Sequence, residues 1–302
     1  MGQVEVARRD DEDGPGITTF LQSVRDASGS RPIDDDSWDA LVAGRPAGSA
    51  GFVARDPGSG RVVGYAQLDG EPGSWQLAYV LDPALTGGLA TGQALCRAAL
   101  DIVARRGGGH VRCWVRMATA TSDEIAASVG LTCDRELHQM RRPLPLEPDG
   151  SAPLATRPFR VGEDESVWLE LNNRVFASHP DQGSWTAATL SARERQPWFD
   201  PDGFLLYERE GKIAAFCWTK IHDDEPRVGE IYVLGADPAI QAHGIGRGML
   251  RAGLEWLSAK GLRTAMLYVE ADNAPAAELY AAAGFVVDHD DRSYVGDVEP
   301  AG

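Results

Sequence analysis

The sequence predicts an α/β fold built as two successive domains of similar design. The chain has 302 residues, about twice the usual length of a compact domain. Near its middle, the stretch 141–157 carries four prolines and a Pro-Asp-Gly turn without helical or strand periodicity, which is typical of a linker. We therefore expect an N-terminal domain over residues 1–143, a linker over 144–156 and a C-terminal domain over 157–302.

A weak internal repeat supports this division. The segment Tyr79–Pro83 of the first half corresponds to Val233–Pro238 of the second, and Ile125–Leu131 corresponds to Leu279–Phe285. The Asp-Pro pair and the later glycine are 48 residues apart in the first half (82 to 130) and 47 apart in the second (237 to 284). Matching order and spacing indicate a tandem duplication, so the two domains should share one fold.

The first elements of the second half form a predicted three-stranded meander. Residues 204–208 and 213–220 are apolar runs on either side of a turn at 210–212, and 230–234 is a third such run. A helix should follow over 246–259, where apolar residues recur at helical spacing. Residues 264–269 then form a further apolar strand.

A second helix completes the predicted order of elements. Asn273 is a suitable N-cap, Pro275 suits the first helical turn, and Gly284 suits a helix C-terminus. The resulting order, three strands, helix, strand and helix, predicts an α/β sandwich.

Composition excludes several classes of partner and site. The chain has 29 Lys plus Arg against 45 Asp plus Glu, a formal net charge of −16, which disfavours nucleic acid and anionic membranes as partners. Its cysteines lack the spacing of a zinc site or a disulfide framework, so we expect no metal. The N-terminal sequence has no apolar signal segment. We expect a cytoplasmic monomer that acts on a small molecule.

The loop Gln241-Ala242-His243-Gly244-Ile245-Gly246 is the first candidate binding site. Its glycines allow backbone N–H groups to turn inward at a helix N-terminus, where the helix dipole favours anions. Arg247, with His243 or Arg251, could add positive charge. The loop predicts a pyrophosphate site, although a plain turn has the same composition.

Together with the helix and strand that follow it, this loop resembles the acetyl-CoA signature of the GCN5-related N-acetyltransferase family. The resemblance includes Asn273 and the ending Leu279-Tyr280-x-x-x-Gly284-Phe285. It implies two tandem domains of this family, each a mixed, mostly antiparallel sheet flanked by helices, with acetyl-CoA as co-substrate. The residues that it implies for acetyl-CoA binding are Leu234, Gly235, Ala236, Gln241, Ala242, His243, Gly244, Ile245, Gly246, Arg247, Asn273, Ala274, Pro275, Ala276, Ala277 and Glu278.

Five further segments resemble tandem members of the family that acetylate the cysteinyl amine of desacetylmycothiol, a cysteine linked to a glucosamine-inositol pseudodisaccharide. These segments are 172–176, 179–183, 218–220, 229–233 and 267–273. The implied acceptor-binding residues are Asp35, Asp181, Lys220, Glu230 and Tyr268. Asp181 stands where the family usually has Glu. Asp35 lies in a run of three aspartates, which a solvated acidic turn would also explain.

Glu230 and Tyr280 are the candidate catalytic residues. An amine attacks a thioester only when neutral, and an α-amino group has a pKa near 8, so a base such as Glu230 is useful. Strand alternation should place Glu230, Tyr232 and Leu234 on one face. The resemblance assigns the backbone N–H near Leu234 to the thioester carbonyl and Tyr280 to protonation of the CoA thiolate. A solvated carboxylate and a packing tyrosine are the alternatives.

The first half lacks the counterparts of these groups. Residues 84–92 contain no basic side chain, Ala126 replaces Tyr280, and Trp75 or Gln76 replaces the base. We expect a degenerate acetyltransferase-like domain with no chemistry and weak or no acetyl-CoA binding.

Two other functions stay open for the chain: a tandem acetyltransferase for another amine or a peptide N-terminus, and a non-catalytic acetyl-CoA-binding module. The sequence predicts surface or capped positions for four histidines, namely His110, His138, His222 and His289.

Overall fold

A computed structural model describes residues 4–10, 12–29, 32–33, 49–147, 154–179, 182–222, 227–240 and 244–302. The chain forms two compact units. The first unit comprises Met1–His138, Glu270–Asp272 and His289–Gly302, and the second comprises Gln139–Val269 and Asn273–Asp288.

In the first unit, a sheet carries helices on both faces. The strand order is β1-β2-β3-β4-β5-β12-β6. The elements before the linker are β1 (Glu5–Arg8), α1 (Gly14–Ser28), β2 (Ala50–Arg55), β3 (Val62–Glu71), β4 (Gly73–Leu81), α3 (Gly88–Arg105), β5 (Gly109–Val115), α4 (Ala120–Ser128) and β6 (Thr132–Pro143).

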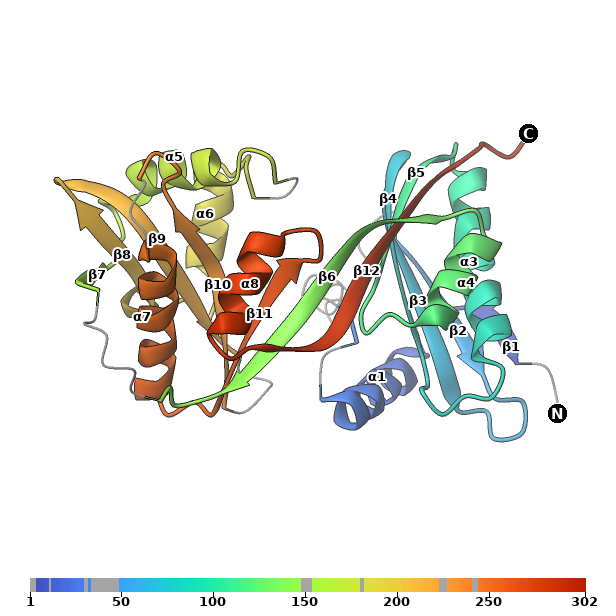
Figure 1. The fold of residues 1–302 in the computed structure, drawn as a ribbon. Coiled ribbons are helices and arrows are strands. Elements are labelled where there is room, and N and C mark those ends of the chain that lie inside the picture. The colour runs from blue at the N-terminus through green and yellow to red at the C-terminus, as the bar shows by residue number, and fades with distance from the viewer. Residues whose placement is uncertain are drawn as a thin grey trace. The chain divides into compact units, whose positions relative to one another are not determined.

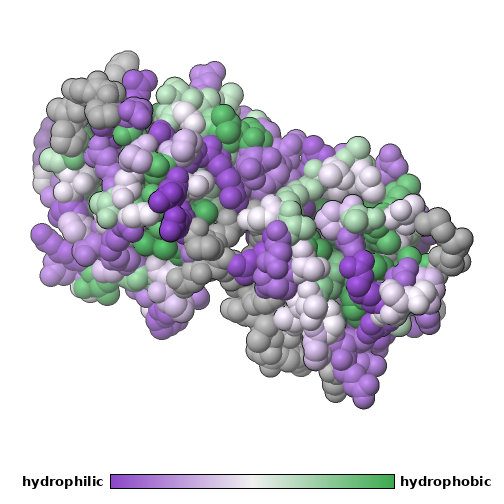
Figure 2. All heavy atoms as spheres, turned by 90° about the horizontal axis from the view of Figure 1, so that it is seen from below, coloured by the Kyte–Doolittle hydropathy of each residue, from purple (hydrophilic) through white to green (hydrophobic). Residues whose placement is uncertain are grey.

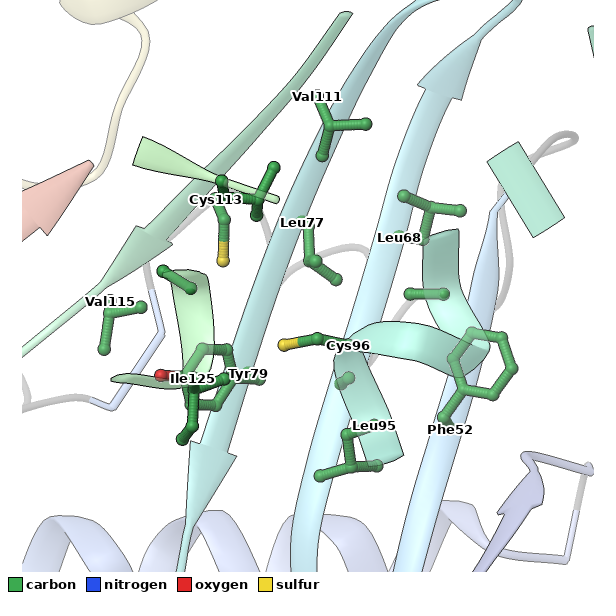
Figure 3. Packing of buried hydrophobic residues seen from close by; sticks show 14 of the residues in the cluster. Phe52, Leu68, Leu77, Tyr79, Leu95, Cys96, Val111, Cys113, Val115 and Ile125 are labelled. Carbon is green, nitrogen blue, oxygen red and sulfur yellow. The ribbon is translucent and has the colours of Figure 1, made fainter. Parts of the chain in front are cut away.

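Two buried clusters hold these helices to the sheet. Leu95 and Cys96 of α3 and Ile125 of α4 pack on Leu77 and Tyr79 of β4 (Figure 3). Helix α1 contributes a separate cluster on the other face of the sheet. Burial of the apolar stripe of each helix is therefore what fixes the three layers of this unit.

The second unit repeats the design around the order β6-β11-β10-β9-β8-β7, in which β10 and β11 are parallel and the pairs β10–β9, β9–β8 and β8–β7 are antiparallel. The elements after the linker, labelled in Figure 1, are β7 (Thr156–Pro158), α5 (Glu165–Val175), α6 (Ala187–Glu194), a 3-10 turn (Pro201–Gly203), β8 (Phe204–Arg209), β9 (Lys212–Ile221), β10 (Val228–Ala236), α7 (Ile245–Ala259), β11 (Thr264–Glu270), α8 (Ala274–Ala282) and β12 (Val286–Val298).

The predicted elements of the second half are confirmed to within a few residues at each end. Asn273 caps α8 by accepting a hydrogen bond from the Ala276 N–H at 3.3 Å, and Pro275 lies in its first turn. At the β8–β9 turn, Glu210 and Gly211 have φ of 53° and 73°, a left-handed conformation that the glycine adopts without strain. The α/β fold class predicted for the chain is confirmed.

The last strand of each half joins the other half, which the sequence did not indicate. Residues Arg292–Val298 of β12 pair antiparallel with Val115–Gly109 of β5 in the first unit. Strand β6 begins in the first unit, and its last residues, from Gln139 onward, belong to the second. The compact units therefore differ from a division in chain order at residues 143 and 157.

The visible surface of the protein is largely hydrophilic, as expected for a chain rich in charged residues. Figure 2 shows hydrophilic residues spread over the visible surface, with smaller hydrophobic areas between them. Four large apolar side chains are exposed in the described part of the chain: Val161, Val167, Val286 and Val287. No described helix combines the length and the apolar character needed to span a bilayer.

Candidate functional site

Strand β10 separates from β11 after its first three residues. The parallel register between them runs from Val228 opposite Thr264 to Glu230 opposite Met266. Beyond Glu230, β10 continues to Ala236 in register with β9 alone among the described strands. A register shift between Ile231 and Val233 marks a β-bulge at this point. The bulge and the loss of the parallel partner open the sheet immediately after Glu230.

The glycine loop ends at the N-terminus of α7. Gly244 is the N-cap with φ of 97°, which a residue with a Cβ rarely adopts, and no side chain of the described residues caps the helix. The first turn has no acidic residue and includes Arg247. Its backbone N–H groups and the helix dipole therefore suit an anion, as the sequence predicted. Residues 241–243 of the loop, Gln241, Ala242 and His243, lie outside the described residues.

A cavity of about 710 Å³ lies beside this helix start. Arg142, Arg247 and Arg251 bring positive charge to its wall, and Glu147 is the acidic residue among its lining. The other lining residues are Leu146, Leu154, Gly244, Gly248, Leu250, Leu254, Leu279, Ala282, Ala283 and Gly284. The cavity is therefore a local basic region in a chain whose net charge is −16.

Tyr280 lies on α8 and is buried. Its ring packs edge-on against Phe285, with 6.1 Å between the centroids. Burial, with a smaller contribution from the Cys217 thiol, raises the pKa of Tyr280 above its ordinary value. The phenol therefore keeps its proton at physiological pH and can act as a donor. The ring of Tyr280 therefore packs in the core, as the alternative of a packing tyrosine expects. The catalytic role of its hydroxyl stays a prediction.

Glu230 is buried on the face opposite α7, next to Lys220 of the neighbouring strand β9 and to His222, which follows that strand. Its residue is 6% exposed, which excludes the solvated strand-end alternative. Lys220 of β9 stands directly opposite it in the register. His222 Nε2 lies 2.9 Å from Glu230 Oε2. The sequence predicted a surface or capped position for His222 and did not predict this contact with Glu230. The contact forms because β9 and β10 are antiparallel neighbours, which brings the imidazole ring next to the carboxylate.

Aromatic rings hold Lys220 beside this carboxylate. The Lys220 ammonium lies 5.1 Å from the centroid of the Trp198 ring and 6.0 Å from that of Tyr232, both within cation–π range. Such contacts restrict a long side chain that would otherwise be mobile. The Lys220 ammonium is thus presented on the same face as Glu230.

The bulge changes the expected alternation along β10. Tyr232 and Val233 both pack against the aromatic cluster on the α5 side, whereas Leu234 packs with the α7 side. Leu234 therefore does not share the face of Glu230, because the bulge adds one residue between them. Gly235 has a steric reason to be glycine: a Cβ there would lie 2.6 Å from the Phe216 ring.

Tyr268 is anchored by a strand from the first half of the chain. Its hydroxyl accepts a hydrogen bond from Gln139 Nε2 at 2.9 Å, and Arg141 Nε donates to Gln139 Oε1 at 2.7 Å. Gln139 is 1% exposed and belongs to β6. Sequence reasoning missed Gln139 and Arg141, because a contact between residues 129 positions apart leaves no local signal.

The two remaining acceptor candidates, Asp35 and Asp181, lie outside the described residues, so they stay predictions. The residues predicted at the start of α8, from Ala274 to Glu278, form its first turns. Among the described residues there is no group of three His, Cys, Asp or Glu side chains that could hold a metal ion.

The first unit has a similar split sheet but lacks the counterparts of Glu230 and Tyr280. Its parallel pair β4–β5 ends at Ala78 opposite Trp114, and α3 begins after Gly87, whose φ is 88°. A cavity of about 640 Å³ lies at this place. Trp75, one candidate equivalent of the base, is buried and donates its indole N–H to the Gly108 carbonyl at 3.1 Å, which is a structural contact.

We expect calorimetry with acetyl-CoA to find one tight site per chain. The second unit has arginines at its helix start, whereas Arg116 is the basic residue among the lining of the first cavity. Each missing ion pair with a phosphate weakens binding. The matched control is Arg247→Ala, which should weaken the tight site. Two equal tight sites in the parent would contradict this prediction.

Solved structures share the fold over the whole chain. A GCN5-related N-acetyltransferase from Sphaerobacter thermophilus matches with a TM-score of 0.73 at 20% identity, covering 99% of this chain and 97% of that one. A tandem GNAT protein from the clavulanic acid biosynthesis pathway matches with a TM-score of 0.68 at 17% identity, covering 99% and 100%. These similarities establish the tandem architecture.

The split sheet with a glycine-capped helix beside it is the architecture of an acetyltransferase of the GNAT class, and residues 167–285 match the model of the Acetyltransferase (GNAT) family. A mycothiol acetyltransferase of Streptomyces bingchenggensis is 42% identical over 84% of this chain and 83% of its own length. Another, from Acidimicrobium ferrooxidans, is 40% identical over 92% of each chain. The chain belongs to the mycothiol acetyltransferase family and is an acetyltransferase.

Proposed function

We propose that this chain transfers the acetyl group of acetyl-CoA to the cysteinyl amine of desacetylmycothiol, the last step of mycothiol biosynthesis. The observation that carries the proposal is the buried Glu230 at the point where β10 leaves β11, with Lys220 and His222 beside it. We further propose that the enzyme works as a cytoplasmic monomer and has neither nucleic acid nor membrane as a partner.

Acetyl-CoA would bind at the start of α7, where this chain offers helical N–H groups and three arginines to an anion. The predicted set of contacts runs from Leu234 to Ala236, over the glycine loop to Arg247, and along Asn273 to Glu278. The opening between β10 and β11 would admit the pantetheine arm, with its thioester near Leu234. Charged side chains at this place offset the repulsion that the net charge of −16 exerts on a nucleotide.

The acceptor would lie on the face that carries Glu230. Lys220 and Tyr268 supply donors for the hydroxyl groups of a pseudodisaccharide, and Asp35 and Asp181 complete the predicted set. Glu230 would take the proton of the acceptor's ammonium group, directly or through water, which leaves a neutral amine. The nitrogen then attacks the thioester carbon, and the C–S bond breaks. The nitrogen loses its surplus proton to solvent as the amide forms, and solvent returns a proton to the Tyr280 phenol.

Two groups would stabilise the charge that this attack creates. The backbone N–H near Leu234 would donate to the carbonyl oxygen as negative charge develops on it. Tyr280 would give its proton to the departing CoA sulfur, a role that suits a phenol whose raised pKa keeps it protonated. The reaction is a direct transfer in a ternary complex, with no acetyl-enzyme.

Cys217→Ala should therefore retain at least about half of the parent kcat. Burial raises the pKa of the Cys217 thiol to about 12, so at pH 7 to 8 it stays protonated and is a poor nucleophile. Acetyl transfer is measured as CoA release, with the melting temperature as the control for folding. Loss of transfer in a folded Cys217→Ala protein would require an acetyl-cysteine intermediate.

The test of the proposed function is a substrate panel. Purified protein is mixed with acetyl-CoA and one acceptor at a time: desacetylmycothiol, an aminoglycoside or a peptide with a free N-terminus. We expect the highest kcat/KM with desacetylmycothiol. Preference for another acceptor would make this a related tandem acetyltransferase, and acetyl-CoA binding without release of CoA for any acceptor would make it a binding module.

A further inference from the structure

One histidine lies against the carboxylate to which the proposed function assigns the base. His222 follows β9, and its backbone N–H donates to the Val228 carbonyl at 3.3 Å, which ties it to the start of β10. Its Nε2 is 2.9 Å from Glu230 Oε2. The two side chains are only 15% and 8% exposed. This is a defined, largely buried contact between two titratable groups.

We propose that His222 is a positioning residue for Glu230, an inference that rests on the proposed function. An ionised carboxylate only accepts hydrogen bonds, so the hydrogen between the two groups is carried by Nε2. Donation to Oε2 orients the carboxylate that takes the proton from the acceptor's ammonium group. The proton passes from the amine nitrogen to the Glu230 carboxylate and later to solvent, and no bond of the imidazole changes.

The contact also favours the ionised form of Glu230. A buried carboxylate without donors holds its proton more tightly, and a hydrogen bond to the charged form opposes this. Among the described residues, the other titratable groups on this face include Lys220 of β9, Tyr232 of β10 and Tyr268 of β11, with Arg141 bonded to Gln139 beside Tyr268. Acidic residues at 223–225 lie outside the described residues. Lys220 lies over aromatic rings, and His222 contacts a carboxylate oxygen of Glu230.

Two substitutions separate this role from packing. His222→Leu removes the donor at similar volume, and His222→Gln places an amide N–H where Nε2 lies. In His222→Leu we expect the acidic limb of the profile of kcat/KM against pH to move up by about one pH unit. Below this limb kcat/KM should fall about 10-fold relative to the parent, and at pH 9 it should be close to that of the parent. His222→Gln should keep the limb close to that of the parent.

A purely structural role would lower the rate equally at every pH, or would affect both variants alike, and either result would overturn the proposal. A second measurement needs no acceptor. In ¹⁵N NMR spectra, the parent's His222 ring should carry hydrogen on Nε2, and Glu230→Gln should shift the Nε2 resonance, because a neutral amide oxygen is a weaker hydrogen-bond acceptor than a carboxylate.

The two measurements distinguish two failures. If the parent releases no CoA with desacetylmycothiol, but its His222 ring responds to Glu230→Gln as expected, the proposed function fails while the contact stands. If the ring does not respond to Glu230→Gln, the positioning role itself is wrong.

Discussion

We expect Glu230→Gln to lower kcat/KM by about 100-fold or more at pH 7, the usual contribution of a general base. Gln has nearly the same shape, and its carbonyl oxygen can still accept from His222, so the fold should persist. The loss should shrink towards pH 9, where more of the acceptor amine, with a pKa near 8, is already neutral. The profile of CoA release against pH measures both effects.

Glu170→Gln is the matched control, because Glu170 is an exposed glutamate of α5. It should reproduce the parent profile over the whole pH range. A Glu230→Gln protein with parent rates at pH 7, or with an equal loss at every pH, would remove Glu230 from the role of base.

The second large effect is expected for Tyr280→Phe, with a fall in kcat of at least about 10-fold and little change in KM for acetyl-CoA. The substitution removes only the hydroxyl and keeps the contact with Phe285. Because burial raises the pKa of Tyr280, the parent phenol stays protonated up to at least its ordinary value near 10. Tyr280 should therefore contribute no alkaline limb between pH 7 and 9.

Tyr207→Phe serves as the control for Tyr280→Phe, because Tyr207 is a partly buried tyrosine of β8 outside the candidate site. Parent rates are expected for this control. Equal kcat values in Tyr280→Phe and the parent would show that the thiolate leaves without help from this phenol.

Local signals in the sequence were sufficient for the elements around the site. The glycine at 244, the cap at Asn273 and the apolar spacing of α7 each depend on neighbours within a few residues. The bulge at Tyr232 has no such signal, because a single inserted residue leaves the composition of the strand unchanged. The sequence therefore predicted β10 correctly but placed Leu234 on the wrong face.

The contact between His222 and Glu230 could have been inferred from hairpin register. Once Lys220 is placed opposite Glu230, the residue two positions further along the chain, just after β9, points to the same face. The Gln139–Tyr268 contact could not, because it joins strands from the two halves. The exchange of β6 and β12 between the two halves could not be inferred either. Both are the final strands of similar repeats, so the pairing pattern is the same whichever of the two lies beside β5 or β11.

The exchange of these strands has a consequence while the polypeptide is being made. Strand β5 ends at Val115, but the strand that covers its edge is β12, which leaves the ribosome last among the described elements. At 5 to 20 residues per second, the intervening translation takes roughly 10 to 40 seconds. For that interval the nascent first unit has an uncovered strand edge, the feature that recruits unwanted partners. Synthesis of β12 ends this interval, because its pairing with β5 covers the edge.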